Sequence, residues 1–160
     1  MDPLFGKILE IFALPQVGLS TIFAAAFIGA TLLPLASEPA VMAYTLIDPS
    51  NHFWPAVLVG TAGNFLGGLI SFWMGTWGTE RFKPEQFVKL KPWLDKMGPS
   101  AMFFTFLPVV GDPLTMIGGW LKLPFWPSCL WMLLGKFSRY AIMTALGVWG
   151  WHFVKPLFSL

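Results

Sequence analysis

Residues 33–39 read Leu-Pro-Leu-Ala-Ser-Glu-Pro and residues 107–113 read Leu-Pro-Val-Val-Gly-Asp-Pro, so a carboxylate bracketed by prolines occurs twice within apolar sequence. The similarity continues downstream at a constant offset of 72 residues. The matched residues are Phe53-Trp54-Pro55 with Phe125-Trp126-Pro127, Gly63 with Gly135, Phe65 with Phe137, Ile70 with Ile142, Gly75 with Gly147, and Trp77-Gly78 with Trp149-Gly150. The chain is therefore an internal duplication, and each copy keeps one acid, Glu38 or Asp112, where apolar surroundings make a charge costly.

The composition is typical of a membrane protein rather than of a soluble domain. Of the 160 residues, 56% are hydrophobic and 11% are charged, with a mean hydropathy of +0.66. Soluble domains average about 25% charged residues. Two uncharged runs, 11–37 and 49–79, are long enough for a helix of about 20 residues that crosses a bilayer. The run 97–111 and the apolar stretch 39–47 are shorter, so we expect both to enter the membrane and turn back.

The charged residues are concentrated in the middle of the chain. Residues 80–96 hold eight of them and are rich in lysine, so the positive-inside rule predicts a cytoplasmic loop at 79–98. The net charge of +2 is too small to favour a nucleic-acid partner. Cys129 is the single cysteine, which excludes a disulfide framework. A cleaved signal peptide over 17–37 is an alternative, but the same pattern recurs at Leu107, where no such signal can lie.

These patterns predict an all-α integral membrane protein with a single domain, residues 1–160. We expect an amphipathic helix at 3–14 to lie along the membrane interface. A first repeat at 17–78 and a second at 99–151 would flank the basic loop 79–98. In each repeat a re-entrant helical hairpin precedes one transmembrane helix.

Prolines are expected to turn the two hairpins: Pro34 and Pro39 in the first, Pro108 and Pro113 in the second. Residues 48–51 are expected to form the turn before the first crossing. One crossing per copy reverses the side from which the next copy starts, so the two copies would form an inverted repeat, with one hairpin dipping from each face. A full crossing by 17–35 would reverse this parity, and that alternative stays open.

Two cations lie near the centre of the last crossing. Lys136 and Arg139 are three residues apart, which puts them on one side of a helix. An arginine at that depth costs about 2.5–3.5 kcal/mol on insertion scales, so it needs a partner or water. Glu38 and Asp112 are the partners that the sequence offers. A purely structural ion-pair cluster that fixes the hairpins is the alternative to a substrate or ion path.

The duplication matches Lys136 with Asn64 and Arg139 with Gly67. The two matched residues belong to a stripe of small side chains in the first crossing, Gly60, Gly63, Asn64, Gly67, Ser71 and Gly75. Such stripes usually let helices pack closely. No nucleophile with a base and no metal-ligand cluster accompanies the charges, since His52 and His152 stand alone. We therefore expect no enzyme, no cofactor and no metal, unless the two acids share a proton as an aspartic dyad.

The stretches 31–39, 63–75 and 107–140 resemble the DedA superfamily, also called the VTT or SNARE-associated domain, and most closely its short YqaA-type branch. The resemblance covers nearly the whole chain. It implies a multi-pass protein of the bacterial inner membrane that transports or scrambles a lipid, undecaprenyl phosphate or a phospholipid. Glu38 matches the acid of the family's first hairpin and Arg139 its basic residue. Asn64 stands where other members have an aspartate, and Asp112 where they have an arginine.

The sequence as a whole favours a small inner-membrane lipid transporter or scramblase, with membrane lipids as its partners. Arg139, Lys136 and Asn64 are the candidate residues for binding an anionic or zwitterionic headgroup. Glu38 and Asp112 are the candidates for charge pairing or proton coupling. A small-ion transporter or channel, or a non-transporting assembly factor that recruits a partner through the basic loop, remains the alternative, and a homo-oligomer stays open.

Overall fold

The computed structural model describes residues 15–31, 37–78, 91–107 and 110–158, and every element within these ranges is a helix. The elements are α2 (Pro15–Thr31), α3 (Ser37–Ile47), α4 (Pro49–Trp77), α6 (Lys91–Met97), the 3₁₀ helix η1 (Gly98–Phe106), α7 (Gly111–Trp120) and α8 (Phe125–Phe158). The prediction of an all-α protein is confirmed. The predicted interfacial helix at 3–14 and most of the loop 79–98 lie outside the described residues, although α6 falls within that loop.

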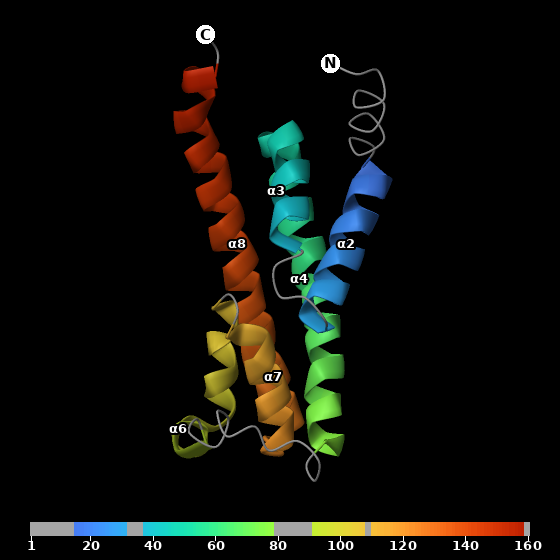
Figure 1. Cartoon of the computed structure of the whole chain (residues 1–160), viewed down its shortest axis with the longest axis vertical. Coiled ribbons are helices and arrows are strands. Elements are labelled where there is room, and N and C mark those ends of the chain that lie inside the picture. Colours follow the sequence, from blue (N-terminus) through green and yellow to red (C-terminus); the bar gives the residue numbers. More distant parts are fainter. Residues whose placement is uncertain (1–14, 32–36, 79–90, 108–109, 159–160) are drawn as a thin grey trace.

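Two long helices, α4 and α8, run along most of the molecule and contact each other (Figure 1). From one end, α2 descends to mid-length and α3 returns to the same end. From the opposite end, η1 rises to mid-length and α7 descends again (Figure 1). Among the described residues α4 is the one helix that is long and apolar enough to cross a membrane, with a mean hydropathy of 1.4 over its best window. In α8, Lys136 and Arg139 interrupt the apolar sequence.

The prolines begin helices instead of separating them. Pro39 lies in the first turn of α3 and Pro113 in the first turn of α7. A backbone N–H in the first turn has no partner within the helix, so proline is tolerated there. The returning helices were expected to begin at Pro39 and just after Pro113, and they begin two residues before each of these prolines, whereas Pro34 and Pro108 lie outside the described residues.

We expected residues 48–51 to form a turn before the first crossing. In the structure Asp48 is the N-cap of α4 and residues 49–51 form its first turn. Asp48 caps the helix: its carboxylate accepts hydrogen bonds from the backbone N–H groups of Ser50 and Asn51 at 3.2 and 3.3 Å. The Ser50 hydroxyl and the Asn51 amide add side-chain bonds of 2.6 and 2.7 Å. These side-chain bonds, with Ser50 contributing most, lower the pKa of the partly exposed Asp48 to about 2. Pro49 follows at the first helical position, which its fixed φ favours.

Two groups of buried apolar side chains hold the helices together, one towards each end. The first joins α2, α3, α4 and α8 through Ile22, Ala26, Val41, Tyr44, Ala56, Val57 and Tyr140. The second joins α6, η1, α7 and α8 through Leu94, Ala101, Met102, Leu114, Ile117 and Met132. The small-residue stripe of α4 is buried, and its glycines Gly63 and Gly67 let α2 approach closely: a β-carbon on Gly63 would lie 2.6 Å from the Phe23 carbonyl oxygen. Large apolar side chains such as Trp73, Trp77 and Trp126 cover the exposed surface, as lipid contact requires.

Candidate functional site

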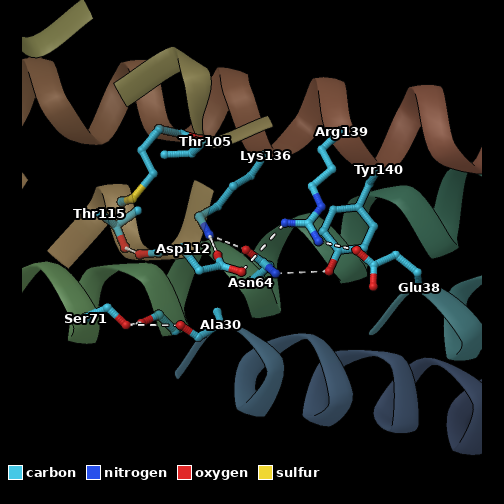
Figure 2. Close-up of polar contacts among 12 residues, drawn as sticks. Ala30, Glu38, Asn64, Ser71, Thr105, Asp112, Thr115, Lys136, Arg139 and Tyr140 are labelled. Atoms are coloured by element: carbon cyan, nitrogen blue, oxygen red, sulfur yellow. Dashed lines mark hydrogen bonds and ion pairs between the residues drawn. The ribbon is translucent and has the colours of Figure 1, made fainter. Parts of the chain in front are cut away.

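Four charged side chains meet at mid-length, between α3, α4, α7 and α8 (Figure 2). Lys136 and Arg139 lie on the inward side of α8, with exposed fractions of 0% and 2%. Asp112, in the first turn of α7, is 8% exposed, and the Glu38 side chain, in the first turn of α3, is 16% exposed. The predicted charged residues are thus all in one cluster, here called the central cluster, together with Asn64 of α4.

Lys136 has two partners in this cluster. Its ammonium nitrogen Nζ lies 3.0 Å from Oδ1 of Asp112 and donates a second hydrogen bond to Oδ1 of Asn64. A lysine that is fully removed from solvent is costly unless it is paired and hydrogen-bonded. Here one carboxylate neutralises the charge and one amide oxygen satisfies another proton of the ammonium group. Lys136 is therefore a buried internal cation with a specific environment.

Arg139 lies between the two acids. Its Nη2 donates to Oε1 of Glu38, and its Nη1 lies 3.7 Å from Oδ2 of Asp112. Since Asp112 also contacts Lys136, three ion pairs connect the helix starts of α3 and α7 through α8. No hydrogen bond between the carboxyl groups of Glu38 and Asp112 occurs among the described contacts, and the guanidinium separates them. The geometry gives no support to a proton-sharing dyad.

Tyr140 belongs to the site although the pattern of charges did not reveal it. Its hydroxyl accepts a hydrogen bond of 3.2 Å from Nδ2 of Asn64, and its side chain is 2% exposed. Asn64 therefore connects Lys136 to Tyr140. The spacing could have indicated this role, because Tyr140 follows Lys136 by four residues and so projects from the same side of α8.

A small cavity lies beside the pair of Glu38 and Arg139. It has room for about one water molecule, ≈ 20 Å³, and is lined by Glu38, Val41, Met42, Arg139, Tyr140, Met143 and Thr144. These residues come from α3 and α8 alone. At this cavity the described helices α3 and α8 are incompletely packed against each other.

A helical chain with an apolar surface around a buried, charge-balanced cluster has the organisation of an integral membrane protein. Its relatives agree with that class. Over 139 residues the chain is 35% identical to the inner membrane protein YqaA of Escherichia coli, and the match covers 85% of this chain and 97% of the relative. The YqaA protein of Shigella flexneri matches equally, and an uncharacterized protein of Haemophilus influenzae is 36% identical over 78% of this chain. No family model and no solved structure matches the chain.

The chain belongs to the YqaA-type branch of the DedA superfamily and is a bacterial inner membrane protein. The resemblance first indicated by the duplicated acid-proline phrases is thereby confirmed.

Proposed function

We propose that this protein is a small lipid transporter or scramblase that moves the headgroup of undecaprenyl phosphate or of a phospholipid past the central cluster. One observation carries the proposal: Arg139, almost fully buried at mid-length, is held between Glu38 and Asp112 from two different helix starts. Charges at such a depth usually mark the path of a substrate. A guanidinium also presents several donors in a plane, which suits the oxygens of a phosphate group.

The proposed architecture is an inverted repeat in the membrane. In it, α2 with α3 and η1 with α7 are re-entrant hairpins from opposite faces, and α4 and α8 are the two crossings. Contacts between equivalent residues support this arrangement. Gly60 lies against the Tyr140 ring, and Gly68, the counterpart of Tyr140, lies against Met132, the counterpart of Gly60. Contact pairs that exchange in this way are expected around a twofold axis.

The charge balance of the cluster limits what it can bind. Two acids and two cations sum to zero formal charge, so no spare cation awaits an anionic headgroup. A phosphate would have to replace a carboxylate at Arg139, and Glu38 is the more exposed of the two. Protonation of Glu38 would weaken its hold on Arg139, which would couple lipid movement to protons. A zwitterionic headgroup could replace the pair of Glu38 and Arg139 without any change in net charge.

The proposal is tested by lipid movement in reconstituted vesicles that contain fluorescent lipids. The double variant Glu38→Gln/Arg139→Gln removes one acid and one cation and leaves Asp112 paired with Lys136, so it should stay folded and lose lipid movement. Asp95→Asn/Lys96→Gln, which removes an acid and a cation from the exposed surface of α6, is the matched control and should keep full activity. Undiminished lipid movement in the first variant would refute the role of the cluster.

The same vesicles distinguish the ion-transport alternative. Both acids are already paired with cations in the cluster, which makes them poor sites for a free cation. A pH-sensitive dye inside the vesicles should therefore report no proton flux in the absence of a transported lipid. Proton flux without lipid movement, lost in Glu38→Gln, would replace the lipid proposal by ion transport.

A further inference from the structure

We infer that a phosphate-bearing headgroup reaches Arg139 through the interface between α3 and α8, and that α3 is the helix that moves to open this interface. An interface between two packed helices is here called a seam. The inference rests on the proposed function and adds the path, the side and the moving element. It follows from a comparison of two seams that occupy equivalent places in the two halves of the chain: α4 with α7, and α8 with α3.

The seam between α4 and α7 is closed by direct contact of backbones. A β-carbon on Gly75 would collide with the carbonyl oxygen of Met116, and a β-carbon on Gly119 would collide with the carbonyl oxygen of Phe72. Because the two helices touch through backbone atoms at these positions, no side chain lies between them that could change rotamer and make room. We therefore assign α7 to the rigid part of the protein.

The seam between α8 and α3 has a glycine and a methionine at the equivalent positions, but different atoms face the glycine. Gly147 is the counterpart of Gly75, and Met42 stands four residues after Glu38 as Met116 stands four after Asp112. At Gly147, however, the neighbouring atoms belong to the Met42 side chain and not to the backbone. Methionine has three rotatable bonds and repacks easily. This seam can separate by movement of side chains, which the first cannot do.

The cavity described above lies in this flexible seam, and two of the polar atoms of its lining residues have no hydrogen-bond partner among the described residues. Oε2 of Glu38 and Oγ1 of Thr144 are buried and make no hydrogen bond with the described residues. Thr144 is 1% exposed and lies five residues beyond Arg139 on α8. Buried polar atoms without partners are rare and call for an explanation. A headgroup oxygen that passes between α3 and α8 would meet the Thr144 hydroxyl before it reaches Arg139.

The seam leads to the end of the molecule at which α3 meets α4 (Figure 1). This end is opposite to α6, which belongs to the predicted cytoplasmic loop. The headgroup would therefore enter the α3–α8 seam from the external side of the inner membrane.

A reversible cross-link tests the movement of α3. In a Cys129→Ser background, Met42→Cys/Gly147→Cys should form a disulfide, since Cγ of Met42 lies 3.7 Å from the position of a β-carbon on Gly147. Oxidation should reduce lipid movement at least ten-fold, and a reducing agent should restore it. Met102→Cys/Gly118→Cys, which joins η1 to α7 within the rigid half, is the matched control. Full lipid movement with α3 locked to α8 would overturn the inference.

A second measurement does not depend on lipid transport. Thr144→Cys should react with a membrane-impermeant maleimide added outside, because opening of the seam exposes it to water. Thr105→Cys is the control, since Thr105 is equally buried but lies against α8 in the other half. We expect modification at position 144 to be at least ten-fold faster. Equal modification rates at positions 144 and 105 would overturn the inference, even if the Glu38 and Arg139 double variant behaves as proposed. Absence of lipid movement in the unaltered protein would instead overturn the proposed function, and the route with it.

Discussion

Asn64 and Lys136 hold equivalent positions in the two copies of the duplicated sequence, and the Lys136 ammonium donates a hydrogen bond to the Asn64 side-chain oxygen. A residue meets its own counterpart where two related halves face each other. Identical residues would fail there: two lysines would repel, and two asparagines would leave Asp112 without its nearest cation. The two copies have therefore diverged at their point of contact, one into a cation and the other into a neutral acceptor.

Removal of Lys136 alone should be strongly destabilising. Lys136→Met leaves Asp112 buried without its closest partner, which typically costs about 3–5 kcal/mol of unfolding free energy. The double variant Asp112→Asn/Lys136→Met removes both charges and should regain more than half of that loss. Tryptophan fluorescence during denaturant titration in detergent micelles measures both, with the exposed Lys96→Met as a control. A double variant no more stable than the single one would contradict the pairing.

Gly119→Ala should loosen the contact between α4 and α7. The added methyl group would collide with the Phe72 carbonyl oxygen, and overpacking of this kind costs about 1–3 kcal/mol. Gly150→Ala is the matched control, since a β-carbon there meets nothing within 4 Å and alanine is the better helix former. In detergent, the melting temperature of Gly119→Ala should be lower than that of the unaltered protein, and that of Gly150→Ala should be higher.

The Asp48 cap predicts a pH dependence of stability. The folded-state pKa of Asp48 is lowered to about 2 from an ordinary 3.8. The stability that the ionised carboxylate contributes to the fold is therefore fully present above pH 3.8 and is lost as the pH falls through 2. Asp48→Ala should therefore lower the melting temperature at pH 7, and the difference from the unaltered protein should shrink between pH 4 and pH 2. Asp95→Ala, on the exposed surface of α6, should change little at either pH.

Lys122 offers a stabilising substitution. It follows α7 with a φ of 53°, in the left-handed region that glycine usually occupies at a helix end. The Lys122 N–H donates to the Gly119 carbonyl and the Leu123 N–H donates to the Gly118 carbonyl, which is the hydrogen-bond pattern of a Schellman motif. Lys122→Gly should raise the unfolding free energy by about 1 kcal/mol, because a left-handed side chain costs about 1–2 kcal/mol. Lys122→Ala keeps the strain and should not gain stability.

The helices and the members of the charged cluster could be predicted because both depend on the cost of charge in an apolar phase. Long uncharged runs indicated the helices, and Arg139 needed an acid, of which the apolar sequence offered few. The same argument brought Glu38, Asp112 and Lys136 together. Family membership was predictable as well, because the duplicated phrases are specific.

The remaining details depend on geometry that a residue pattern does not express. Pro39 and Pro113 indicated where the returning helices begin to within three residues, but a proline is compatible with several positions in the first turn, so the exact first residue depends on the packed chain. Tyr140 carries no charge, so its part in the cluster follows from its distance to Asn64. The difference between the two seams is a matter of whether a glycine faces a backbone or a methionine.

The balance of two acids against two cations in the central cluster has an electrical consequence. A membrane potential does work of about 2.3 kcal/mol per elementary charge for each 100 mV that the charge traverses. Rigid displacement of a group of zero net charge gains nothing from that field. If transport by this protein responds to voltage, the response measures the charge of the cargo or of a proton that accompanies it.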